Sequence, residues 1–288
     1  MKTKLLLALA AGCCAMSAAH ADTTHTITGY ADCTPGGFLE GATLDADGQM
    51  WAVDLFPKTI LRISEGACTV VAELPVPPNG AKFRADGIMV LTTHGGLYTF
   101  DPATGDVAML VDTFEGEPLV GLNDLSFDAE GGMYFTAPMG SDLANPVGRV
   151  YYMAPGSTEI EIFAEGLAFP NGVAVHPNGR TVIVSEFAAK RLVALPAKTA
   201  VGGVQITYVF AHTTGGVGAD GMTFDADGNL YAAVIEAGKL SVFDASGAWV
   251  EDIALPAEAG HLITNLAITD EALLVTEALK AQVWQIAR

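Results

Sequence analysis

Short hydrophobic runs alternate with polar turns along almost the whole chain. A typical unit has the run 42–44 (Ala-Thr-Leu), a turn at 45–48, and the run 50–53 (Met-Trp-Ala-Val). Runs of this length, bounded by Asp, Asn and Gly, predict β-strands joined as hairpins. No long segment shows the periodicity of an amphipathic helix. The pattern therefore predicts an all-β protein.

The turn between paired runs recurs along the chain. Turns fall near residues 45, 84, 128, 176, 225 and 270, and a third hydrophobic run follows each hairpin. Units of about 45 residues that repeat in this way favour a six-bladed β-propeller. A two-sheet sandwich is the alternative, but it does not predict such self-similarity. The turn sequences are Asp45-Ala-Asp-Gly, Arg84-Ala-Asp-Gly, Asp128-Ala-Glu-Gly, His176-Pro-Asn-Gly, Asp225-Ala-Asp-Gly and a degenerate Thr269-Asp-Glu.

The two ends of the repeat array complement each other. The last unit stops after its third run, at Arg288, whereas the β-prone run 24–30 precedes the first unit. We expect this N-terminal run to supply the fourth strand of the last blade, because that closes the ring and covers an open sheet edge.

A polar residue stands five positions before each turn, and we call these six residues the ring residues. Each precedes the innermost strand of its blade, and those strands converge on the central channel of a propeller. Turn chemistry is the competing explanation, because Asn-Gly and Asp-Gly are common turn dipeptides. A glutamate is a poor turn residue, however, and the third member lacks the glycine. The ring residues are Glu40, Asn79, Asn123, Asn171, Asp220 and Asn265.

The side chains of the ring residues favour a hard metal ion. Carboxylate and amide oxygens suit calcium, which accepts large and irregular oxygen sets more readily than magnesium. No His/Cys cluster with zinc spacing occurs in the sequence. The pattern predicts one Ca²⁺, with other divalent cations possible.

Further candidates stand where the second strand of each hairpin ends, because that end returns to the ring face. His94 is the only histidine so placed, which makes it a candidate for substrate contact or proton transfer; a histidine that only completes a turn is the alternative. Glu186 is expected to pair with Arg191 in a structural role. The other residues at these ends are Asp54, Glu236 and Glu277.

The N-terminus and the charge concern location and partners. Lys2 and Lys4, an apolar run and Ala19-His-Ala21 predict a signal peptide over 1–21, followed by a single propeller domain over 22–288. A lipoprotein signal cut before Cys13 is a poorer fit. We expect an exported protein, periplasmic or extracellular. The formal charge of −19 argues against nucleic acid and anionic membranes as partners. The sequence does not indicate an oligomeric state, so a monomer is assumed.

Two cysteines remain after the predicted cleavage, Cys33 and Cys68. Export would permit a disulfide. Our tracing places Cys33 on the ring face and Cys68 on the opposite face, a separation too large for a bond. We therefore expect both thiols to be free.

Four segments resemble the senescence-marker-protein, regucalcin and gluconolactonase family. They are 39–51, 122–134, 169–175 and 219–231, each leading a blade. The resemblance implies a metal-dependent hydrolase. It also implies that Glu40, Asn171 and Asp220 hold the divalent metal, and that Asn123 contacts metal or substrate.

One departure concerns the substrate. Sugar-lactonase members have an arginine two residues before the third-blade asparagine, where this chain has Gly121. The surrounding sequence is more similar to drug-responsive lactonases, which favours a less hydroxylated or aromatic lactone.

The expected activity is calcium-dependent opening of a lactone or related ester at the mouth of the channel. Asp220 would act as metal ligand and as general base or nucleophile, with Asn123 and His94 as further catalytic candidates. A calcium-dependent phosphotriesterase of the same architecture is one alternative. A non-catalytic extracellular propeller that binds a partner is the other.

Overall fold

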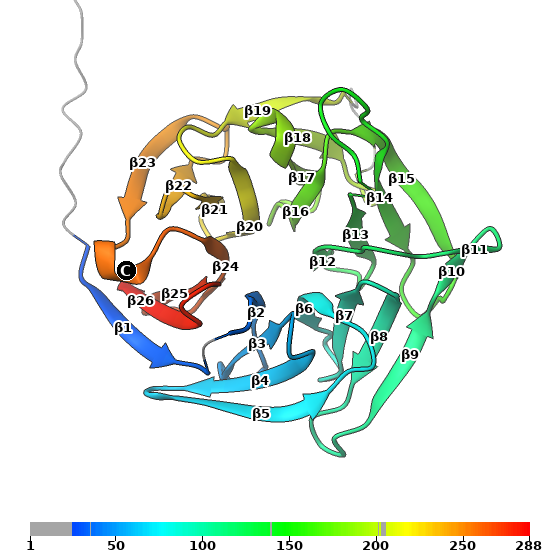
Figure 1. Cartoon of the computed structure of the whole chain (residues 1–288). Coiled ribbons are helices and arrows are strands. Elements are labelled where there is room, and N and C mark those ends of the chain that lie inside the picture. The colour runs from blue at the N-terminus through cyan, green and yellow to red at the C-terminus, as the bar shows by residue number, and fades with distance from the viewer. Residues whose placement is uncertain (1–24, 35, 139, 201, 203–205) are drawn as a thin grey trace, which may run out of the picture.

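The computed structural model describes residues 25–34, 36–138, 140–200, 202 and 206–288. Six four-stranded antiparallel sheets are arranged as blades around a central axis, which confirms the predicted six-bladed propeller (Figure 1). Helical structure in these ranges amounts to two short 3-10 segments, η1 (Phe187–Ala189) and η2 (Ala257–Ala259). Neither is long and apolar enough to cross a membrane. The predicted signal peptide lies outside the described residues.

Strands follow one another from the channel outward in each blade. A small additional hairpin, β10 (Thr113–Phe114) and β11 (Glu117–Pro118), extends from the connection between the second and third blades. The blades, in chain order, are β2 (Leu39–Leu44), β3 (Met50–Asp54), β4 (Thr59–Ser64) and β5 (Ala67–Glu73); β6 (Pro78–Phe83), β7 (Met89–Thr93), β8 (Gly96–Phe100) and β9 (Val107–Val111); β12 (Leu125–Phe127), β13 (Met133–Ala137), β14 (Gly148–Met153) and β15 (Ile160–Leu167); β16 (Pro170–Val175), β17 (Thr181–Glu186), β18 (Arg191–Pro196) and β19 (Tyr208–His212); β20 (Gly218–Phe224), β21 (Leu230–Ile235), β22 (Lys239–Phe243) and β23 (Trp249–Ala254); and β24 (Ile263–Ile268), β25 (Ala272–Glu277), β26 (Gln282–Ala287) and β1 (Ile27–Asp32).

The repeated Asp-containing turn is explained by its hydrogen bonds. Asp45 Oδ1 accepts the backbone N–H groups of Asp47 at 3.0 Å and Gln49 at 2.9 Å. Asp128 and Asp225 bind their own turns in the same way. A short carboxylate that satisfies its own backbone favours this turn over other conformations. The repeated turn therefore has a structural role. It lies at the end of the blade that is opposite to the ring residues.

The N-terminal strand closes the ring as expected. β1 pairs antiparallel with β26, with Ile27 opposite Ile286 and Asp32 opposite Gln282. The first and last described strands therefore belong to one sheet, and β26 is not left as an open edge.

The expectation of free thiols is wrong, because Cys33 and Cys68 form a disulfide with a Cα–Cα distance of 5.1 Å. Adjacent strands rotate relative to each other, so the outermost strand of a blade lies steeply inclined to the innermost one. β1 consequently runs along the rim toward the start of β5 (Figure 1). Tyr30 also accepts the N–H of Gly66 at 2.7 Å. This inclination brings the two cysteines closer together than strands parallel to the channel axis would.

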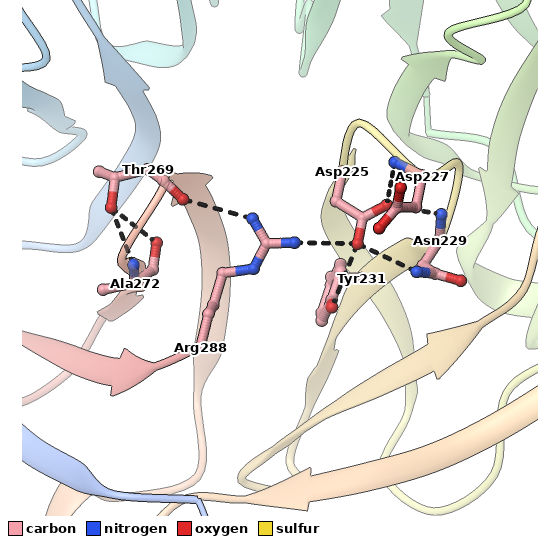
Figure 2. A network of polar contacts seen from close by, with 7 residues as sticks. All are labelled: Asp225, Asp227, Asn229, Tyr231, Thr269, Ala272 and Arg288. Atoms are coloured by element: carbon pink, nitrogen blue, oxygen red, sulfur yellow. Dashed lines mark hydrogen bonds and ion pairs between the residues drawn. The ribbon is translucent and has the colours of Figure 1, made fainter.

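The last residue ties two blades together. Arg288 donates to Asp225 Oδ2 at 3.0 Å and to the Thr269 carbonyl at 3.3 Å. Asp225 is buried, and its carboxylate also accepts from Asn229 and Tyr231. Figure 2 shows the guanidinium between the turn of the fifth blade and that of the sixth.

Candidate active site at the ring residues

Each ring residue is placed by an irregularity at the start of an inner strand. The pairing of first and second strands shifts register at this point in five blades. In the third blade Asn123 lies just before β12, where its N–H donates to the Thr136 carbonyl at 2.9 Å. A bulge bends its strand and redirects the side chains around it. The five shifts lie between Glu40 and Thr43, Pro78 and Ala81, Pro170 and Val173, Ala219 and Met222, and Ile263 and Asn265.

The glycine that follows several ring residues is required by the neighbouring blade. A Cβ at Gly172 would lie 2.2 Å from the Asp220 carbonyl oxygen, and a Cβ at Gly221 would lie 2.4 Å from the Asn265 side chain. Both distances are far below van der Waals contact. The Asn-Gly and Asp-Gly pairs therefore lie inside strands and serve close packing between blades; they are not turn dipeptides.

Buried hydroxyl groups fix the ring residues from the neighbouring blade. Thr136 donates to the Asn171 carbonyl at 2.7 Å, and Ser185 donates to the Ala219 carbonyl at 2.6 Å. Thr92 and Thr264 likewise donate to carbonyls of the neighbouring blade, those of Asn123 and Leu39. These hydroxyls were missed in the sequence, where their signal is a Thr or Ser inside an otherwise apolar strand.

Three buried carboxylates interact at the centre of the ring. Glu40 is 5% exposed, and Asp220 and Asp124 are each 3% exposed. Burial, and then the negative charges of Asp220 and Asp124, raise the pKa of Glu40 well above its ordinary value. Burial, and then Asp124, raise the pKa of Asp220 likewise, opposed by a hydrogen bond from Asn171.

Asp124 is a residue that the sequence analysis missed. It stands one position after the ring residue Asn123, where four other blades have glycine. Burial raises its pKa, and attraction to the Lys82 ammonium opposes that rise. Burial lowers the pKa of Lys82 itself. The signal of Asp124 in the sequence is the missing glycine at this position.

The two buried asparagines of the ring differ in their side-chain oxygens. Asn171 Oδ1 is buried and has no hydrogen-bond partner among the described residues. Asn265 Oδ1 accepts the N–H of Leu266 at 2.8 Å. A buried oxygen without a donor costs about 1–3 kcal/mol, so its persistence needs an explanation. A cation at the ring would provide one for Asn171.

The donor set therefore fits a hard divalent cation. Glu40 and Asp220 supply carboxylates that repel each other when no cation is present, and Asn171 supplies a free amide oxygen. No group of three or more His, Cys, Asp or Glu side chains arranged to hold a metal occurs in the described parts of the chain. Such a site would depend on the amides as well as the carboxylates.

A depression of about 450 Å³ opens on the ring face. His94 is exposed, and it lines the depression together with Asn79 and Asn123. The rest of the lining is mostly apolar or small and consists of Val120, Gly121, Pro138, Gly140 and Phe169. The structure thus brings His94 and Asn123 to one cavity.

The acidic residues at the second-strand ends have structural partners. Asp54 accepts the N–H of Phe38 at 2.6 Å, and Glu277 accepts that of Leu262 at 3.3 Å. Glu186 accepts from Ala168 and forms the predicted ion pair with Arg191. These three side chains anchor the loops that lead into β2, β16 and β24. Glu236, in contrast, lies just beyond the end of β21.

Comparisons with known proteins agree with this architecture. The lactonase drp35 of Staphylococcus aureus strain MW2 is 28% identical over 242 residues, which is 79% of this chain and 73% of that protein. The drp35 of Staphylococcus saprophyticus is 29% identical with the same coverage.

Two solved structures share the fold. A gluconolactonase from Xanthomonas campestris superposes with a TM-score of 0.78, 23% identity and coverage of 91% of this chain and 89% of the other. Regucalcin from Agrobacterium tumefaciens, described as a calcium-binding protein, gives a TM-score of 0.74, 22% identity and coverage of 89% and 94%. The profile of the SMP-30/gluconolactonase/LRE-like region matches residues 38–278. The chain therefore belongs to the SMP-30/gluconolactonase/LRE-like family.

Proposed function

We propose that the protein is a hydrolase that opens a lactone or related ester, using one Ca²⁺ held at the ring. The observation that carries the proposal is the pair of buried carboxylates, Glu40 and Asp220, beside the unpartnered oxygen of Asn171. Membership of a family that includes lactonases supports the reaction class.

The ligands proposed for the cation are Glu40, Asn123, Asn171 and Asp220. When bound, a divalent cation would polarise the substrate carbonyl and stabilise the negative charge that develops on its oxygen. Asn123 is a ring residue that also lines the depression, so a cation bound by it would lie within reach of a substrate there. It would orient the carbonyl group.

Asp220 is the proposed proton acceptor. Water adds to the carbonyl carbon, the ring C–O bond breaks, and the proton taken by Asp220 passes to the departing oxygen. Direct attack by the Asp220 carboxylate, followed by hydrolysis, remains the second form of the same proposal. His94 lines the depression, and we expect it to contact the substrate there.

The lining of the depression supports a weakly hydroxylated substrate. Val120, Pro138 and Phe169 offer apolar contact, and Gly121 has no side chain to bind hydroxyl groups. An aliphatic or aromatic lactone would bury apolar surface here, whereas a sugar lactone would have only Asn79, Asn123 and His94 to bind its hydroxyl groups.

We also propose that the protein is exported. The N-terminal pattern supports a cleaved leader, and the Cys33–Cys68 bond suits an oxidising compartment, where disulfides persist.

A pH-stat assay tests the function. Residues 22–288 are stripped with chelator and offered aromatic, aliphatic and sugar lactones before and after calcium is added. We expect turnover only with calcium, and faster on aromatic or aliphatic lactones. Calcium binding with no lactone turnover would reject the proposal, and release of an alcohol or fluoride from phosphotriesters would then identify a phosphotriesterase. Inactivity on both classes would favour the binding propeller.

A further inference from the structure

Two charged residues in the channel break the pattern that the other blades keep. Three positions after the ring residue, the second blade has Lys82, where the others have Thr43, Ser126, Ala174, Thr223 and Ile268. One position after it, the third blade has Asp124, where the first, second, fourth and fifth blades have glycine.

These two departures meet in space. Lys82 Nζ donates to the carbonyl oxygen of Ala42, on the inner strand of the neighbouring blade, at 2.9 Å. Lys82 and Asp124 attract each other, and Asp124 in turn repels Glu40 and Asp220. Asp124 also binds the N–H of Leu125 at 2.8 Å, so its position is fixed. Gly80, two residues before Lys82, packs so closely on the third blade that a Cβ there would lie 2.9 Å from the Asp124 Cα, so the ammonium lies within electrostatic range of the Asp124 carboxylate.

The charges balance for one divalent cation. Glu40 and Asp220 must be ionised to hold a metal. Together with Asp124 they carry three negative charges, and the Lys82 ammonium neutralises one of them. A single Ca²⁺ neutralises the remainder, whereas a second would leave two positive charges in a buried site, which is unfavourable.

We propose that Lys82 is a positioning residue that serves as a built-in cation beside Asp124, so that the channel takes up one calcium ion and not two. The inference rests on the calcium site of the proposed function. Without the ammonium, the Ala42 carbonyl loses its donor and the Asp124 carboxylate loses its opposing charge, and both offer the hard oxygens that calcium prefers. Lys82 thus occupies the place that a second ion would otherwise take.

Calcium stoichiometry provides the test. Chelator-stripped wild type, Lys82→Met, Lys82→Arg and Lys82→Met/Asp124→Asn are examined by equilibrium dialysis with metal analysis. Lys280→Met is the matched control, because Lys280 also donates to a carbonyl, that of Glu258, but on the exposed surface. We expect one equivalent for wild type, Lys82→Arg, Lys280→Met and the double variant, and two for Lys82→Met.

Unfolding in chelator gives a second readout that needs no metal. Lys82→Met should lower the urea midpoint, and adding Asp124→Asn should recover it, because the double variant leaves no unpaired charge. Two equivalents in wild type, one in Lys82→Met with an unchanged Kd, or additive effects on the midpoint would overturn the role of Lys82. No calcium in wild type would overturn the calcium site of the proposed function and this inference with it.

Discussion

Asn171 and Asn265 hold equivalent places in two blades, yet only one side-chain oxygen is already occupied. The Asn265 oxygen binds the N–H of Leu266, whereas the Asn171 oxygen has no partner in the part of the chain that the structure describes. Equivalence in a repeat therefore does not imply equivalence in chemistry. This difference divides the ring into residues available to a ligand and residues that maintain the strand.

The first prediction compares these two asparagines. Asn171→Ala should raise the calcium Kd at least tenfold, because it removes a proposed ligand. Asn265→Ala should change the Kd less than threefold but lower the free energy of unfolding by about 1 kcal/mol, since it removes an internal hydrogen bond. Calorimetric titration and urea unfolding measure the two effects. Equal effects on the Kd would contradict the division.

A second prediction concerns Asp220. Replacing it with Asn keeps an oxygen ligand but removes the proton acceptor, so kcat should fall about 10²–10⁴-fold. Metal-free Asp220→Asn should unfold at a urea concentration no lower than wild type, because repulsion with Asp124 is removed. Asp227→Asn, in a surface turn, is the control. Undiminished kcat in Asp220→Asn would exclude the role given to Asp220.

The raised pKa values of Glu40 and Asp220 predict a pH dependence. A carboxyl group with a raised pKa binds more protons in the folded state, so without metal its ionisation costs stability. The free energy of unfolding in chelator should fall as pH rises from the ordinary carboxyl range through the raised values, by up to about 1.4 kcal/mol per pH unit for each group.

Urea unfolding between pH 4.5 and 7.5 measures this slope. Saturating calcium should remove most of it, because the cation offsets the buried charges. Asp220→Asn should flatten it in chelator. Stability that rises with pH throughout this window in chelator would refute the assignment.

At the scale of strands, the inner strands are held at their ring ends by bulges, close glycine contacts and hydroxyl groups. The repeat, the hairpins and all six ring positions could be predicted, because period-two patterning and turn residues are local signals. The bulges, the role of Gly172 and the link from Thr136 to Asn171 could not, since they depend on the neighbouring blade.

Substituting Gly172 tests the close approach between blades. Gly172→Ala forces a Cβ against the Asp220 carbonyl, so it should destabilise the fold by about 1–3 kcal/mol and weaken calcium binding. Gly29→Ala in β1 meets no atom within 4 Å and is the matched control, with little change expected. Chemical unfolding of both variants measures the change in stability, and calcium titration measures the change in Kd. Equal stability of the two variants would mean that the strand shifts without cost.

At the scale of the whole molecule, the strand that closes the ring could be predicted, whereas the disulfide beside it could not. The pairing of β1 with β26 followed from a missing strand at one end of the repeat and a spare one at the other. The disulfide could not be predicted from the sequence, because its geometry depends on the twist accumulated across a blade. Asp124 was missed for a related reason, since its partner Lys82 lies in another blade.

Removing the disulfide should weaken the closure. Cys33→Ser/Cys68→Ser should lower the free energy of unfolding by about 3–4 kcal/mol, as expected for a loop of this length on chain entropy. Urea unfolding of the oxidised wild type and the variant measures the difference. Wild type kept in reductant is the control and should match the variant. Identical midpoints for oxidised wild type and the variant would show that strand pairing alone closes the ring.

The register of β1 and β26 also determines how the molecule would respond to a pulling force. Ile27 lies opposite Ile286, so the outer ends of the two strands leave the sixth blade at the same point. Tension applied across these ends would separate the strands one hydrogen bond at a time, as in a zipper, instead of shearing all of them at once. The opening would halt at Cys33, where the covalent link to the first blade begins. The disulfide thus acts as a mechanical stop for the separation of β1 from β26.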